Sequence, residues 1–335
     1  GFFVRIYKFD NLKFLLILLV VIGHFCDLYI NDYVVLKKIF IFVYAFHMPL
    51  FIFVTGLFQK KITSYKMVPI KKILFYLGLI YFMKITIFLV SKKYNLGYNF
   101  EMFSGSEVYW YLGAIIIYNL LIPITNKINY IYLFVFSIII GLFVGYDNSI
   151  GDYLYLSRVI VFFPFYLLGY FFSDNRELIL RLSSSLGVKI ISFLIISLFF
   201  YWCFNDINYI YKYRMLFTGR NAYSLIDSFV CSYKHRLFTY FISFVVGSSI
   251  FCIVPSRKIK IISNLGKNTL QVYVLHQPIV FLLKGVGFFE LLRGEFGNYF
   301  IYVYLLIAII LTCFLSIRKF RLLFNYIQRK MFVDD

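Results

Sequence analysis

The chain has 335 residues, of which 62% are apolar and only 15% are charged, whereas a soluble domain has roughly 45–50% apolar and about 25% charged residues. A single soluble core stops growing near about 250–300 residues, so this composition excludes an ordinary soluble fold, and it also excludes a disordered or a disulfide-rich secreted chain. The formal net charge of +19 is explained by the basic cytoplasmic loops of a membrane protein and gives no reason to expect nucleic-acid binding.

Continuous apolar runs of about 15–20 residues predict membrane-spanning helices, because the strands of a membrane barrel are shorter and alternate in polarity. The approximate cores of the predicted spans are 11–29, 39–58, 73–90, 109–123, 130–146, 157–172, 189–204, 237–254, 269–286 and 299–316. The chain is therefore predicted to be an all-α polytopic membrane protein with about ten transmembrane helices, forming one integral-membrane domain over residues 1–335.

The orientation of these spans follows from the basic residues. If the N-terminus is cytoplasmic, most Lys and Arg residues fall in cytoplasmic loops and in the C-terminal tail, and most Asp and Glu residues fall outside. The positive-inside rule then predicts that both termini are cytoplasmic. The most basic of the inner loops carries Lys60, Lys61, Lys71 and Lys72.

One predicted outer loop, 205–236, breaks this pattern, because it is basic and long and carries interleaved tyrosines. A loop of this length is unusual for a simple connector. Two interpretations stay open: an interfacial amphipathic segment, or a face that holds an anionic or glycan substrate. A re-entrant piece near 220–236 is a further alternative.

The first span holds three ionisable side chains, which are costly inside a membrane. Lys13 and His24 are eleven residues apart, so at about 100° per residue they share one face of a helix and lie about 16 Å apart along it. Counting from the predicted ends, Lys13 lies near the cytoplasmic surface and His24 in the outer half. Asp27 is close enough in sequence to orient the His24 ring.

Two further histidines fall inside predicted spans. His47 is followed by Pro49, which removes a partner from the Ala45 carbonyl and allows the helix to bend there. By helix rise His47 has a depth similar to that of His24, so the two could share a pocket, whereas His276 is about 10 Å from the inner side. The cysteines form no C-x-x-C pair, and we expect them to be small core residues without metal.

Several pieces of the chain together resemble one family. They are Phe9-Asp10-Asn11-Leu12-Lys13, Val20-Val21-Ile22-Gly23-His24-Phe25, Phe46-His47-Met48-Pro49-Leu50-Phe51, Trp110-Tyr111-Leu112 and Tyr273-Val274-Leu275-His276. With them the chain resembles the integral-membrane acyltransferase 3 family, close to the sugar acetyltransferases of the fucose 4-O-acetylase type. Two departures are Thr55, where many relatives have Ser, and Lys13, where many have Arg, which loses a bidentate guanidinium.

The resemblance implies an O-acetyltransferase of the bacterial inner membrane. Its partners would be acetyl-CoA from the cytoplasm, an envelope glycan or lipid-linked sugar as acceptor (O-antigen, capsule or exopolysaccharide), and the lipid bilayer, with neither nucleic acid nor a metal. His24, with Asp27 and His47, would be catalytic, and His24 would act as the general base or take the acetyl group transiently. The remaining site residues follow the two substrates. Lys13, Lys60, Lys61, Lys71, Lys72 and His276 would serve acetyl-CoA, and Glu107 and Trp110 the acceptor.

Two other functions compete with this interpretation. A transporter or flippase of a lipid-linked glycan is disfavoured by the short inner loops and the lack of an internal repeat. A polymerase of an envelope glycan is kept open by the large outer loop 205–236.

Overall fold

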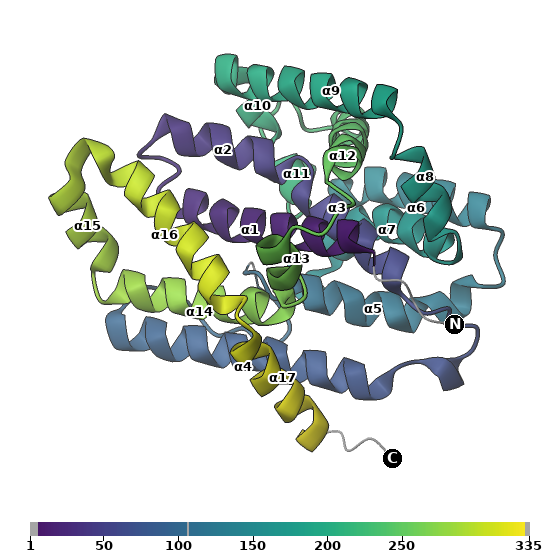
Figure 1. The fold of residues 1–335 in the computed structure, drawn as a ribbon, viewed down its shortest axis with the longest axis horizontal. Coiled ribbons are helices and arrows are strands. Elements are labelled where there is room, and N and C mark those ends of the chain that lie inside the picture. Colours follow the sequence, from purple (N-terminus) through teal and green to yellow (C-terminus); the bar gives the residue numbers. More distant parts are fainter. Residues whose placement is uncertain (1–5, 106, 332–335) are drawn as a thin grey trace. The chain divides into compact units, whose positions relative to one another are not determined.

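The computed structural model describes residues 6–105 and 107–331. Within these ranges every regular element is an α-helix or a short 3-10 helix (Figure 1). An α-helix occupies each of the ten predicted positions, which confirms the all-α class. The number of membrane crossings and the cytoplasmic location of both termini stay predictions.

Seven helical stretches of the described residues are long and apolar enough to cross a membrane. They are Tyr7–Leu28, Val34–Phe58, Ile70–Tyr94, Tyr153–Asp174, Leu186–Asn205, Tyr233–Ile253 and Phe288–Leu315. Trp110–Thr125 and Tyr130–Tyr146 are apolar but shorter. Exposed large apolar side chains line Leu186–Asn205 on most sides, as expected of a helix that faces lipid.

The chain folds into two compact units that alternate along the sequence. Unit 1 comprises the described residues of 1–28, 70–102 and 254–335, and unit 2 those of 29–69 and 103–253. The helices of unit 1 are α1 (Tyr7–Leu28), α4 (Ile70–Tyr94), α13 (Lys260–Leu265), α14 (Thr269–Gly285), α15 (Phe288–Phe296), η7 (Gly297–Tyr299), α16 (Phe300–Leu315) and α17 (Arg318–Met331). Those of unit 2 are α2 (Val34–Tyr44), α3 (His47–Phe58), η1 (Tyr65–Met67), α5 (Trp110–Thr125), α6 (Tyr130–Phe143), η2 (Val144–Tyr146), η3 (Tyr153–Tyr155), α7 (Leu156–Phe171), η4 (Phe172–Asp174), α8 (Arg176–Leu182), α9 (Leu186–Asn205), α10 (Ile207–Ile210), η5 (Tyr211–Tyr213), α11 (Arg214–Thr218), η6 (Tyr223–Leu225) and α12 (Tyr233–Ile253).

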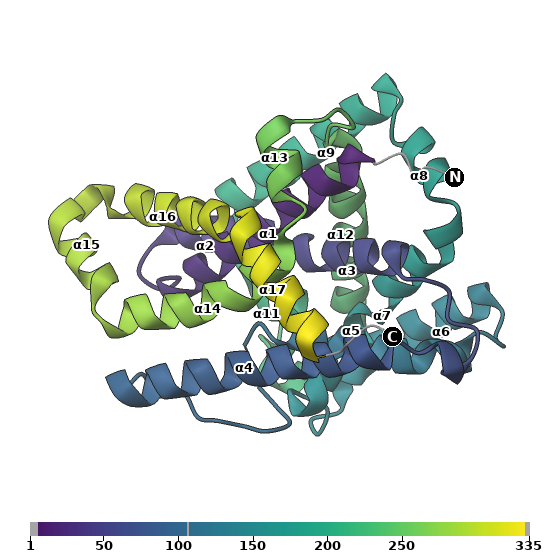
Figure 2. The same cartoon turned by 60° about the horizontal axis from the view of Figure 1, so that its bottom comes forward.

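In unit 1, α1 packs against α13, α14 and α16, and α4 lies along α14 (Figures 1 and 2). The buried Asn11 of α1 holds the segment before α13. Its Nδ2 donates to the carbonyl of Arg257 (3.0 Å), and its Oδ1 accepts from Ser263 Oγ (2.6 Å). This polar anchor is satisfied on both sides, so it costs little to bury and it fixes where the chain enters α14.

Unit 2 contains the break that Pro49 predicts. The run 39–58 is two helices, α2 and α3, separated at Ala45 and Phe46. The Ala45 carbonyl accepts a hydrogen bond from Ser243 Oγ of α12. Because Pro49 has no N–H to offer this carbonyl, the serine satisfies a buried group that would otherwise have no donor.

The α3 and α7 helices of unit 2 touch through backbone. A Cβ at Gly56 would lie 2.2 Å from the Tyr166 carbonyl oxygen, and one at Gly169 would lie 2.0 Å from that of Phe53. Only glycine permits such an approach, which is how helices pack closely in a membrane. The contact joins α3 to the second half of α7.

Candidate active site

Two histidines meet inside unit 1. The rings of His24 on α1 and His276 on α14 have centroids 5.4 Å apart and are tilted by 41°. His276 is fully buried, and His24 is half-buried. Two imidazoles this close can act on one substrate group, one as a base and the other as a hydrogen-bond partner.

A backbone hydrogen bond sets the protonation pattern of the His276 ring. Nδ1 lies 2.9 Å from the carbonyl oxygen of Val272, one turn earlier in α14. A carbonyl only accepts, so Nδ1 carries the proton and the neutral ring has its lone pair on Nε2. Nε2 is buried and has no hydrogen-bond partner among residues 6–105 and 107–331. The ring therefore presents a basic nitrogen within a closed environment.

The pairing corrects the predicted depths of these histidines, since the prediction put His24 in the outer half of the membrane and His276 nearer the inner side. The depth was counted from the predicted ends of each span. In the structure, Gly266 packs against the Asp10 carbonyl oxygen so closely that a Cβ there would lie 1.8 Å from it. Gly266 therefore lies beside the first turn of α1, and it is the observed contact between the two rings that places His276 next to His24.

Lys13 and Asp27 flank His24 on α1, which is one unbroken helix. Lys13 is half-buried, as His24 is, and their spacing places them on one helix face about 16 Å apart. Asp27 is exposed in the last turn. The roles predicted for Lys13 and Asp27 stay predictions.

His47 lies in unit 2, as the first residue of α3. It is buried, its Nδ1 is 2.9 Å from the Val43 carbonyl oxygen, and its ring meets that of Tyr44 edge-on at 4.7 Å. These contacts connect α3 to α2 across the break between them, which indicates a structural role for His47. That His47 shares a pocket with His24 stays a prediction.

The four lysines predicted to hold acetyl-CoA divide between the two units. Lys60 and Lys61 belong to unit 2, and Lys71 and Lys72 begin α4 in unit 1. The Lys61 ammonium donates to the Tyr170 carbonyl (2.8 Å), lies 4.2 Å from the centre of the Tyr170 ring and is 3.6 Å from an Asp174 carboxylate oxygen. Lys61 is thus engaged within its own unit.

Trp110, predicted to serve the acceptor, opens α5 in unit 2 and is buried. Its ring stacks on Phe162 of α7 at 5.3 Å, and the guanidinium of Arg158 lies 4.9 Å from the ring centre. Glu107, the other predicted acceptor residue, is half-buried before α5. The next residue of the resemblance, Tyr111, places its hydroxyl 2.6 Å from Thr55 Oγ1.

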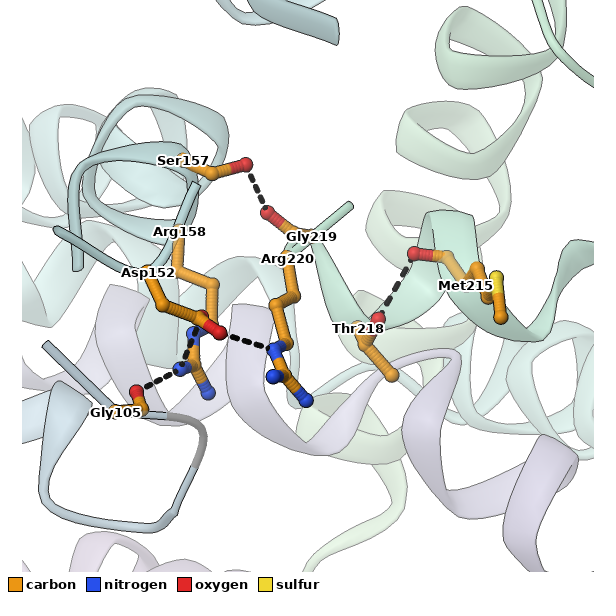
Figure 3. A network of polar contacts seen from close by, with 8 residues as sticks. All are labelled: Gly105, Asp152, Ser157, Arg158, Met215, Thr218, Gly219 and Arg220. Atoms are coloured by element: carbon orange, nitrogen blue, oxygen red, sulfur yellow. Dashed lines mark hydrogen bonds and ion pairs between the residues drawn. The ribbon is translucent and has the colours of Figure 1, made fainter. Parts of the chain in front are cut away.

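The Arg158 guanidinium belongs to a polar cluster that was missed in the sequence (Figure 3). Its Nη2 donates to the Gly105 carbonyl (3.0 Å) and to Asp152 Oδ1 (3.2 Å), while Arg220 Nε donates to Asp152 Oδ2 (2.6 Å). The Arg158 side chain is 6% exposed and that of Arg220 is 42% exposed. One carboxylate thus joins a buried cation to an accessible one. An arginine at the start of an apolar run was the available signal, because its burial is costly.

Residues 6–105 and 107–331 contain no group of three or more His, Cys, Asp or Glu side chains that could hold a metal ion. The ionisable side chains that the structure brings together are the His24–His276 pair in unit 1 and, in unit 2, the cluster of Asp152, Arg158 and Arg220.

A family model described as an acyltransferase domain, Acyl_transf_3, matches residues 6–318. No curated protein and no solved structure matched the chain. The match spans both units and contains both histidines of the pair, and the helices have the length and apolarity of membrane spans. The chain therefore belongs to the acyltransferase 3 family and is a multi-pass membrane acyltransferase.

Proposed function

We propose that the protein is an O-acetyltransferase of the bacterial cytoplasmic membrane that moves the acetyl group of cytoplasmic acetyl-CoA to a hydroxyl of an envelope glycan or lipid-linked sugar. The observation that carries this proposal is the His24–His276 pair, with ring centroids 5.4 Å apart. Transfer to a hydroxyl requires a base for its proton, and imidazole is the side chain suited to this at neutral pH.

In the proposed reaction His24 removes the proton from the acceptor hydroxyl as the hydroxyl oxygen attacks the carbonyl carbon of the thioester. A C–O bond forms and the C–S bond breaks. The imidazolium then returns its proton to the leaving sulfur, so that CoA departs as the thiol. His276 supports this step from one side, because its Nε2 is not used by the described protein groups and can hold the hydroxyl or the His24 ring.

The donor would bind at the end of unit 1 where α1 and α4 begin. Lys71 and Lys72 lie in the first turn of α4. Lys258, on the segment that Asn11 holds against α1, lies 5.7 Å from the centre of the Tyr7 ring. Cations placed in this way suit the phosphate groups of CoA, and Lys13 extends the positive charge along α1 toward His24.

The test uses the purified full-length protein in detergent with acetyl-CoA labelled in the acetyl group, with and without a membrane fraction that contains the glycan. We expect release of CoA thiol and alkali-labile label in the glycan fraction. His235→Ala is a matched control, because His235 lies at the start of α12 in unit 2, where its Nδ1 is 3.0 Å from Ser232 Oγ. Unchanged acetyl-CoA with folded protein and glycan present would contradict the proposal, and glycan transport or polymerisation would then take its place.

A further inference from the structure

Unit 2 contains a cavity of about 370 Å³ in the segment that the sequence predicts to be an external loop. Its wall is formed by α2 and by the short helices α10, η5 and α11 together with the stretch that follows them. The polar side chains in this wall are Lys37, Asn208, Tyr211, Lys212, Arg214 and Asp227. The volume is within the range of small-ligand sites, about 300–1,000 Å³. We call this cavity the basic pocket.

Positive charge dominates the basic pocket. Lys37 comes from α2, and Lys212 and Arg214 come from the loop, so segments far apart in sequence bring three cations to one wall. The single carboxylate, Asp227, already accepts from the Phe229 backbone N–H at 2.9 Å. Within residues 6–105 and 107–331, no carboxylate forms an ion pair with Lys37 or Lys212. Gathered cations repel one another unless an anion joins them.

An aromatic residue lies among these cations. Arg214 Nη1 donates to the Tyr211 hydroxyl (3.0 Å), and the Lys37 ammonium lies 5.4 Å from the centre of the Tyr211 ring. Tyr211 is therefore fixed in orientation, and it offers an apolar ring face beside the charges. The Asn208 amide adds a donor and an acceptor. An apolar face, an amide and several cations suit a sugar ring that carries a carboxylate or a phosphate.

We infer that the basic pocket binds an anionic sugar unit of the acceptor through Lys37, Lys212 and Arg214. Because the loop is predicted to be external, the occupant is the glycan and not acetyl-CoA. The inference rests on the proposed function only in naming the acceptor, since anion binding by the pocket does not require acetyl transfer.

The test measures binding of glucuronic acid, glucose 1-phosphate and glucose by calorimetry to the full-length protein in nanodiscs of uncharged phosphatidylcholine. The acidic sugars should bind and glucose should not. Lys37→Gln with Lys212→Gln should weaken binding by about tenfold per lysine, the effect of one lost charge-assisted hydrogen bond. Lys234→Gln is the control, because Lys234 is an exposed lysine of the same loop outside the pocket wall.

Two results would overturn the inference. One is equal binding of glucose and the acidic sugars, or binding that the double variant retains. The other is displacement of the sugars from the parent protein when phosphatidylglycerol replaces part of the phosphatidylcholine, which would make the occupant a lipid headgroup.

A separate readout keeps this inference apart from the proposed function. Acetyl-CoA hydrolysis without acceptor should be the same in the double variant and the parent protein, because the pocket does not hold the donor. Binding without any acetyl-CoA turnover would contradict only the proposed function. Turnover without binding of the acidic sugars would contradict only the pocket.

Discussion

The ring of His276 lies 5.4 Å from the ring of His24, and the Val272 carbonyl holds the Nδ1–H of His276 so that Nε2 is its basic nitrogen. Of the histidines inside apolar helices, these two share a unit, whereas His47 belongs to the other. The structure thus distinguishes two kinds of histidine. His24 and His276 are close enough to act together in catalysis, whereas His47 connects α2 to α3.

This separation predicts different effects for two matched substitutions. His276→Phe keeps the ring volume and removes both nitrogens, and it should lower acetyl transfer by about 10²-fold, the effect of losing one well-placed hydrogen-bonding group at an active site. His47→Phe should instead lower stability by about 0.5–1.5 kcal/mol, because it removes the buried hydrogen bond of the ring to the Val43 carbonyl, which keeps the Phe46 N–H as a donor. Transfer per folded molecule and thermal unfolding in detergent check both effects. The reverse pattern would move the chemistry to His47.

The second prediction follows from the division of the predicted donor-binding lysines between the two units. Replacing Lys71 and Lys72 together by Gln should raise the KM for acetyl-CoA about tenfold, because phosphate contacts are lost, and the difference should shrink at high salt. Lys61→Gln should leave this KM unchanged, since the Lys61 ammonium binds Tyr170 within unit 2. Steady-state kinetics of the purified variants decide the matter, and an equal rise in all variants would contradict the placement of the donor in unit 1.

The polar cluster of unit 2 predicts a cost in stability. Asp152→Asn keeps the shape of the side chain but removes the negative charge that joins Arg158 to Arg220 (Figure 3), and it should destabilise the protein by about 1–3 kcal/mol. Asp206→Asn, at an exposed loop position, should have a smaller effect. The comparison is made by thermal unfolding in one detergent. Equal midpoints for the two variants would show that the cluster contributes nothing.

The orientation in the membrane is predicted by the lysine asymmetry and is checked by labelling. On a cysteine-free background, Ser228→Cys should react with an impermeant thiol reagent added outside the cell, and Ser64→Cys should react only after permeabilisation. Both positions are exposed, so accessibility within the protein does not confound the result. External labelling at position 64 would reverse the topology and remove the basic pocket from the acceptor side.

The sequence predicted the helices well, because continuous apolar runs are a local signal. Pro49 likewise predicted the bend that appears as the break at Ala45 and Phe46, since the loss of an N–H is a local property. The helical spacing of Lys13 and His24 also depends only on α1.

What the sequence did not predict depends on contacts between distant residues. The contact between the His24 and His276 rings depends on how α14 packs against α1, which no periodicity reveals. The bridge from Arg158 through Asp152 to Arg220 joins the first turn of α7 to the loop that follows α11. Residue spacing along the chain does not predict it. The basic pocket combines Lys37 of α2 with residues of the loop 205–236. The sequence could predict only the part that the loop contributes.

The most direct test of the central claim is the rate of acetyl transfer by His24→Ala, measured in membranes that contain equal amounts of folded variant and parent protein, with His235→Ala alongside. Loss of a general base typically lowers a rate by about 10²–10⁴, and we expect a fall of that size for His24→Ala and none for His235→Ala. A His24→Ala rate within about threefold of the parent, a barrier change of less than ~1 kcal/mol, would contradict the account and remove His24 from the chemistry.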